Sequence, residues 1–189
     1  MTPDERQSLL QDLRRYLKAH YVPEKSSSFP FSFPIIIAAA SAVPTFDSYR
    51  NGRLSDDAKA ALLASIQKML QPGFREMLFE LIRKKGIRNA DLYHRSDITK
   101  AHFSKIKNDE HYHPSKETVL ALALGLKLTL DETKKLLERA GYTLTASSQT
   151  DLVVKYFIDC HLYDIDEVND SLDALGLSTL TNYKRPRKT

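Results

Sequence analysis

Apolar residues recur every three or four positions in several stretches of the chain, which is the spacing of one helix face. The densest such region covers residues 74–141, where five helical patterns follow one another with short polar connections. Pro72-Gly73 breaks the chain just before this region, and Gly141 follows the last pattern. The sequence therefore predicts an all-α fold with a compact five-helix domain at residues 73–141.

Local capping signals divide this region into its helices. The cations Arg83, Lys84 and Lys85 followed by Gly86 are typical of a helix end. Residues that accept hydrogen bonds from free backbone N–H groups mark the next helix starts. The predicted N-caps are, in chain order, Asn89, Thr99, Ser115 and Thr129.

An N-terminal helical region is expected at residues 1–72. Thr2, Pro3 and Glu5 predict a helix start with a capping box. Ser55 is predicted to be the start of a second helix. Between these helices, residues 23–53 are rich in Pro and Phe and are expected to be irregular. The apolar segment 29–37 either packs on its own domain or forms a surface for a partner protein, and the sequence leaves both interpretations open.

Two more helices, beginning at Ser148 and Asp164, are expected in an acidic extension at residues 142–180. Seven anions against Lys155 alone lie between positions 142 and 183. Such a surface suits a homodimer contact, a partner protein, or a cover for a basic face of the same chain. The basic residues 181–189 that follow are predicted to be a disordered tail.

The stretch 87–106, I-R-N-A-D-L-Y-H-R-S-D-I-T-K-A-H-F-S-K-I, contains two short helix patterns joined by a tight turn. Between positions 83 and 107 there are eight cations and two anions. Two helices in this arrangement are typical of a helix-turn-helix, in which one helix offers its outer face to a DNA groove. The apolar positions are Leu92, Ile98, Phe103 and Ile106.

These residues resemble the lambda-repressor-like, Xre-type helix-turn-helix family. The stretch 87–106 aligns with that family's second and third helices without a gap, and P-S-K-E-T-V-L-A-L-A at 114–123 resembles its fourth helix. The motifs D-L-V-V-x-Y-F-I and Y-D-I-D-E-V-N of the extension resemble a C-terminal segment found on a subset of bacterial Xre-like proteins. The resemblance implies a sequence-specific transcriptional regulator that binds double-stranded DNA, as a homodimer on half-sites one helical turn apart.

The same resemblance implies which residues would contact DNA. Base-edge contacts would come from the third helix of the domain, and phosphate contacts from its flanks. The base-contact candidates are Lys100, Ala101, His102, Ser104 and Lys105, and the phosphate-contact candidates are Arg88, Asn89, Lys107 and Asn108. The alternative interpretation is an accessory or adaptor subunit of a larger bacterial assembly, for example a defence system, whose cationic helix face is merely solvated.

Three residues depart from the family pattern at the helix-turn-helix itself. Asn89 stands where the family often has a Gln that contacts a phosphate, and it is shorter but has the same donor chemistry. Asp97 stands in the turn where the family has Gly, and Asp tolerates the left-handed backbone conformation better than most residues. Tyr93 stands where the family has a small residue, so it is expected either to change the helix crossing or to point outward.

Composition narrows the function classes. The lone Cys160 is expected to be a buried, unreactive thiol in a reducing compartment. The longest apolar run, at 34–40, is too short to span a bilayer, so a cytoplasmic protein without membrane contact is expected. His111 and His113 do not have the spacing of a zinc site. Without a phosphate-binding loop or nucleophile motif, we expect no enzyme, cofactor or metal.

Overall fold

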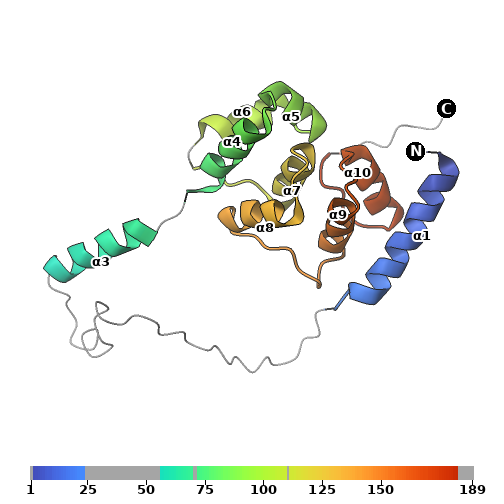
Figure 1. Cartoon of the computed structure of the whole chain (residues 1–189), viewed down its shortest axis with the longest axis horizontal. Helices are drawn as coiled ribbons and strands as arrows, with labels where there is room; N and C mark the ends of the chain where they lie inside the picture. Colours follow the sequence, from blue (N-terminus) through green and yellow to red (C-terminus); the bar gives the residue numbers. More distant parts are fainter. Residues whose placement is uncertain (1, 24–55, 70–71, 110, 183–189) are drawn as a thin grey trace. The chain divides into compact units, whose positions relative to one another are not determined.

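The computed structural model describes residues 2–23, 56–69, 72–109 and 111–182 of the chain. Every regular element in these residues is an α-helix, which confirms the predicted all-α fold. The chain divides into two units, one formed by residues 1–24 with 72–189 and the other by residues 25–71 (Figure 1).

The predicted five-helix region forms five helices in the first unit. The structure gives their bounds as α4 (Phe74–Lys85), α5 (Asn89–Arg95), α6 (Lys100–Asn108), α7 (Lys116–Gly125) and α8 (Leu130–Arg139). Gly86 ends α4 with a φ of 63°, in the left-handed region that Gly adopts without strain.

Most of the predicted caps are confirmed. The side chains of Thr99, Ser115 and Thr129 each accept a backbone N–H at the start of α6, α7 and α8. The prediction for Asn89 is wrong by one position. Arg88 is the N-cap of α5, and its side chain makes no capping hydrogen bond, so Asn89 is the first helical residue.

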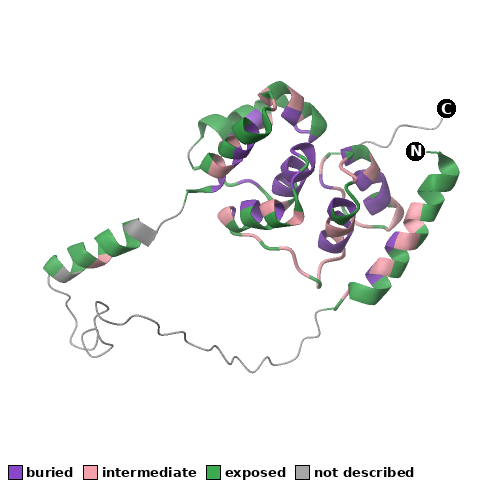
Figure 2. Cartoon of the chain, viewed as in Figure 1, coloured by how far each residue is buried: buried purple, intermediate pink, exposed green. Residues whose placement is uncertain are grey.

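Helix α7 lies at the centre of the first unit. All of its residues from Thr118 to Gly125 are buried (Figure 2). The helix packs against α5, α8 and α10 (Ile165–Ala174), and these three helices together bury it. A helix without a polar face must be surrounded in this way, because any exposed side would leave apolar area in water.

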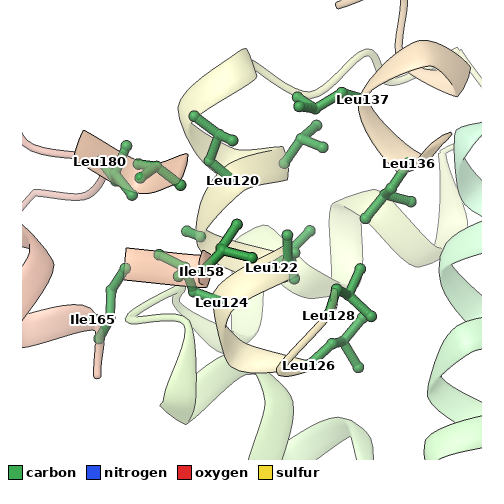
Figure 3. Close-up of a cluster of buried hydrophobic side chains, with 14 of the residues drawn as sticks. Leu120, Leu122, Leu124, Leu126, Leu128, Leu136, Leu137, Ile158, Ile165 and Leu180 are labelled. Carbon is green, nitrogen blue, oxygen red and sulfur yellow. The ribbon is translucent and has the colours of Figure 1, made fainter. Parts of the chain in front are cut away.

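The C-terminal extension completes the same core. Helix α9 (Gln149–Asp159) packs against α8, and α10 packs against both α9 and α7. Figure 3 shows side chains of α7, of α8 and of the extension meeting in one apolar cluster, among them Leu120, Leu122, Leu124, Leu136, Leu137, Ile158, Ile165 and Leu180. The five helices of the helix-turn-helix region therefore share their hydrophobic core with the extension.

The N-terminal helix α1 (Pro3–His20) packs on the extension, mainly on α9. Its predicted capping box between Thr2 and Glu5 is present. Leu13 and Leu17 are its buried residues, and the Tyr16 ring packs edge-on against Tyr156 of α9 at 5.2 Å. Residues 1–72 were expected to form one region, whereas α1 joins the core of the extension.

The second unit contains helix α3 (Asp56–Met69), of which Leu63 and Ile66 are exposed. The predicted cap Ser55 and almost all of the Pro- and Phe-rich stretch 23–53, including the segment 29–37, lie outside the described residues. No helix in the described part of the chain is long and apolar enough to cross a membrane.

The prediction that Cys160 is buried is wrong. Helix α9 ends at Asp159, and Cys160 is the C-cap residue, where the chain turns and the thiol is exposed. The helical pattern extended one residue too far, so an outward-facing position was assigned to the apolar side.

We expect Leu13→Ala to lower the free energy of unfolding by about 2–5 kcal/mol, because Leu13 is fully buried and its loss leaves a cavity between α1 and the extension. Urea unfolding followed by circular dichroism measures this change. Arg14→Ala, at an exposed neighbouring position of α1, is the control and should stay within about 0.5 kcal/mol of the unsubstituted protein. Equal effects of the two substitutions would contradict the docking of α1.

Gly125→Ala tests the close approach of α7 to α5. A methyl group there would overlap the Ser96 hydroxyl and lie 3.1 Å from Leu92 Cδ1. Helix propensity favours Ala over Gly by about 1 kcal/mol, whereas overpacking costs about 1–3 kcal/mol. We therefore expect net destabilisation in thermal unfolding, and a smaller effect in the Ser96→Ala background. An identical effect in both backgrounds would contradict the contact.

Candidate nucleic-acid interface

The turn between α5 and α6 has the geometry of a helix-turn-helix. The Ile98 N–H donates to the Tyr93 carbonyl oxygen at 2.9 Å, which reverses the chain after α5. Asp97 has a φ of 49°, so it adopts the left-handed conformation that the family provides with Gly. The predicted apolar positions are all buried, namely Leu92, Ile98, Phe103 and Ile106.

Tyr93 packs inward, toward α6. It is half-buried, and its ring centroid lies 6.0 Å from that of Phe103. Phe103 also meets Phe79 of α4 edge-on at 6.1 Å. The outward-pointing alternative for Tyr93 is therefore wrong, and the large side chain fills space between the two helices of the motif.

The exposed face of α6 carries four of the five base-contact candidates. Lys100, Ala101, Ser104 and Lys105 are all exposed, and their i, i+1, i+4, i+5 spacing puts them on one side of the helix. Asn108 continues this face by one turn, and its side-chain amide donates to Ser104 Oγ at 3.1 Å. Cationic side chains thus flank small polar and apolar ones on an open surface.

His102 lies at the edge of this face. Its ring is half-buried, and Nε2 is 2.6 Å from the Tyr112 hydroxyl oxygen. Burial, together with the positive charge of Lys105, lowers the pKa of His102 below its usual value. The imidazole is therefore neutral at pH 7 and has one ring nitrogen engaged, which makes it a weaker candidate than the four exposed residues.

Tyr112 was not predicted as part of the site. The Lys105 ammonium lies 4.9 Å from the centroid of the Tyr112 ring, a cation–π distance. Burial raises the pKa of Tyr112, so its hydroxyl stays protonated. Tyr112 follows α6 in a loop, where helical periodicity gives no information, and only the fold brings its ring beneath two side chains of the helix. No cluster suited to a metal ion occurs among the described residues.

The phosphate-contact candidates differ in their exposure and in the partners of their side chains. Arg88 makes a bidentate ion pair with Asp91, with both N–O distances at 2.8 Å. The hydrogen bond from Arg88 lowers the pKa of Asp91, so this carboxylate is ionised at neutral pH. Asn89 is half-buried, whereas Lys107 and Asn108 are exposed. Lys107 is the stronger phosphate-contact candidate of the two. Arg88 could bind a phosphate only by breaking or sharing its ion pair with the Asp91 carboxylate.

The described part of the acidic extension does not cover the exposed face of α6, since Lys100, Ala101, Ser104 and Lys105 stay exposed beside it. Shielding of these residues by the extension, one of the sequence-based interpretations, is therefore wrong for this structure. Thr181, which directly follows the extension and was predicted to belong to a disordered tail, instead meets the turn, where its Oγ1 donates to Asp97 Oδ2 at 2.6 Å.

Residues 77–133, from α4 to α8, match the family model of the Cro/C1-type helix-turn-helix DNA-binding domain. The chain contains a Cro/C1-type helix-turn-helix domain. The predicted lambda-repressor-like resemblance is thereby confirmed, and the matched residues include the whole of α5, the turn and α6. Neither a curated protein nor a solved structure matches the chain.

Substitutions of Asp97 separate its backbone role from its side-chain role. Asp97→Ala should lower the free energy of unfolding by about 1–3 kcal/mol, because Ala tolerates the left-handed conformation poorly and cannot accept the Thr181 hydrogen bond. Asp97→Asn, which tolerates that conformation and keeps an acceptor oxygen, should lose less. Thr181→Val removes this hydrogen bond together with the one that Thr181 Oγ1 accepts from the buried Asn169 amide, so it should cost more than about 1 kcal/mol. Urea unfolding is the measurement, and equal losses for Asp97→Ala and Asp97→Asn would contradict this assignment.

Proposed function

We propose that the chain is a sequence-specific DNA-binding transcriptional regulator that reads base edges with the exposed face of α6. The observation that carries the proposal is the open cationic face of α6 within a Cro/C1-type domain. The opposite side of α6 is anchored in the core by Phe103 and Ile106, which gives this face a fixed orientation. A helix held in this way can enter a major groove without rearranging the fold.

The side chains of this face match the chemistry of base edges. Lys100 and Lys105 can donate to guanine O6 and N7, and the Ala101 methyl group can contact a thymine methyl group. Ser104 can donate or accept. The small size of Ala101 and Ser104 lets the helix backbone approach the groove floor between the two lysines.

Phosphate contacts would fix the register of the helix on the duplex. Lys107 offers an exposed ammonium at the C-terminal end of α6, and Asn89 offers an amide at the first turn of α5. Contacts of this kind add affinity that does not depend on sequence and that weakens as salt is raised.

A homodimer on paired half-sites is part of the proposal. Val22 is the single large hydrophobic residue that is exposed in the described part of the first unit. A dimer formed through the first unit would consequently have a polar interface. The alternative is a dimer formed through surfaces of the second unit. Sedimentation with and without duplex DNA reports which stoichiometry applies.

The adaptor interpretation is the second candidate function, and exposed Leu63 and Ile66 on α3 favour it. Apolar side chains on a helix surface can dock a partner protein. The apolar sides of α9 and α10 are used in the core, so any partner of the extension would meet its acidic surface.

Replacing both lysines of the exposed face should reduce DNA affinity and specificity together. We expect Lys100→Ala/Lys105→Ala to raise Kd for a selected duplex by at least about tenfold, since each lost base contact is worth about 1–3 kcal/mol. Fluorescence anisotropy on a site enriched from random-sequence DNA by the unsubstituted protein measures this change.

Lys134→Ala/Lys135→Ala is the matched control. These two lysines are exposed on α8, outside α5, the turn and α6, and their removal changes the net charge equally. The control should retain the preference for the selected site. Equal losses in the two double variants, or no enrichment of any sequence, would refute the proposed reading by α6.

A further inference from the structure

We propose that Tyr112 positions Lys105 for base reading and thereby sets part of the DNA specificity of the exposed face of α6. The inference rests on the proposed DNA-binding function and adds to it a residue outside the helix-turn-helix. Three observations carry it: the two contacts that Tyr112 makes with α6, the spacing of the residues that it contacts, and the anchoring of the loop that holds its ring.

Tyr112 contacts two residues of α6 with different parts of its side chain. The Lys105 ammonium lies 4.9 Å from the centroid of the ring, where the negative face of the π system attracts a cation. The hydroxyl oxygen lies 2.6 Å from Nε2 of His102, and the two rings meet edge-on with their centroids 5.7 Å apart. The ring therefore supplies the attraction for Lys105, and the hydrogen bond to His102 fixes the orientation of the ring.

His102 and Lys105 are three residues apart on α6, so their side chains are neighbours on the helix surface and one ring can contact both. Burial and the charge of Lys105 lower the pKa of His102, so near neutral pH its imidazole has no charge that would repel the ammonium. Burial raises the pKa of Tyr112, which keeps its hydroxyl protonated. The three side chains thus form one unit whose single positive charge is the Lys105 ammonium.

The loop between α6 and α7 that carries Tyr112 is anchored at both ends. At its start, the Asp109 carboxylate accepts the His111 N–H at 3.0 Å, and the Asp109 carbonyl oxygen accepts the Tyr112 N–H at 3.3 Å. At its end, the Tyr142 hydroxyl donates to the Pro114 carbonyl oxygen at 3.0 Å. The Tyr112 ring itself is half-buried and packs against the core. The ring is therefore a fixed support for the lysine.

A fixed support affects specificity more than affinity. Discrimination between bases requires a donor that is held at guanine O6 and N7, whereas a mobile ammonium binds phosphate oxygens of any sequence. Because the Tyr112 ring restricts the positions of the Lys105 ammonium, it favours the base contact over the phosphate contact. Loss of the ring should therefore reduce the preference for a selected duplex, with little effect on binding to random DNA.

The test compares Tyr112→Leu with Tyr112→Phe in the full chain, by fluorescence anisotropy on the selected duplex and on random duplex DNA. Leu removes the ring, and we expect Kd for the selected duplex to rise about two- to fivefold, the equivalent of a surface cation–π contact. Kd for random DNA should change by less than about twofold, because phosphate contacts do not depend on sequence. Phe keeps the ring and loses only the hydroxyl, so it should retain most of the preference.

The same substitutions in a Lys105→Ala background separate positioning from a structural role. There Tyr112→Leu should leave the preference unchanged, because no ammonium remains to be positioned. If Tyr112 only stabilised the fold, its replacement would weaken binding by the same factor in both backgrounds, and that result would overturn the inference.

Tyr163→Leu is the matched control. Tyr163 is also half-buried and also lies beside a histidine, with 3.4 Å between its hydroxyl oxygen and Nδ1 of His161, but it is outside α6 and the loop that follows. The control should keep the preference for the selected duplex. A loss equal to that of Tyr112→Leu would count against the inference.

Proton NMR of the free protein tests the contact without DNA. The ring current of Tyr112 should move the side-chain methylene signals of Lys105 upfield, and this shift should persist in Tyr112→Phe and disappear in Tyr112→Leu. Lysine signals that are the same in all three proteins would refute the contact in solution, and the inference with it.

The outcomes separate the inference from the proposed function. If Lys105→Ala weakens binding to the selected duplex while Tyr112→Leu leaves Kd unchanged or lowers it, the inference fails and the proposed function stands. If Lys105→Ala itself leaves the preference unchanged, base reading by Lys105 fails together with the inference. A full chain that enriches no sequence would overturn both.

Discussion

The complete burial of α7 is the constraint on which the rest of the first unit depends. Its stretch from Thr118 to Gly125 offers no polar face, so it is stable only when other elements surround it. Helix α5 covers one side, α8 another, and α10 of the extension a third. The extension is consequently part of the folded core of the DNA-binding domain, and the family match, which ends at residue 133, does not mark the end of that core.

This packing also positions the helix-turn-helix. Because Gly125 has no side chain, the end of α7 approaches Leu92 and Ser96 of the α5 region so closely that an added Cβ would overlap the Ser96 hydroxyl. The turn that follows α5 is held a second time by Thr181, the residue that follows the extension, because its hydroxyl donates to Asp97. The turn that leads into α6 is therefore fixed both by α7 and by Thr181. The buried residues of α6 itself, Phe103 and Ile106, add the packing of the helix on the core.

Local signals were enough to predict most of the fold. Caps such as Thr99 and Thr129 act within one helical turn, and the exposed face of α6 follows from helical periodicity alone. Tertiary partners could not be predicted in this way. The Leu13 and Leu17 stripe of α1 indicated only that a partner was needed, and nothing local identified α9.

The same distinction applies to the candidate site. The roles of Tyr112 and Thr181 depend on residues distant in sequence or on loop geometry, for which no periodic pattern exists. His102 was placed correctly on α6, but its pKa is lowered by burial and by the charge of Lys105, and helical periodicity does not reveal this burial. One informative signal was present: the run V-L-A-L-A-L-G lacks any polar face, and such a helix requires more cover than the five-helix domain alone provides.

The two lysines of the exposed face are not equivalent, and the difference bears on specificity. A free lysine side chain loses up to about 2 kcal/mol of rotamer entropy when a contact immobilises it. Lys105 already rests over the Tyr112 ring, so part of that loss occurs in the fold and not at the DNA. The neutral state of His102 maintains this arrangement, because a protonated imidazole would repel the ammonium beside it. In the proposed complex with DNA, Lys105 would thus be a preorganised, directional donor, whereas Lys100, for which no such support is seen among the described residues, would act chiefly as a mobile charge at the start of the helix.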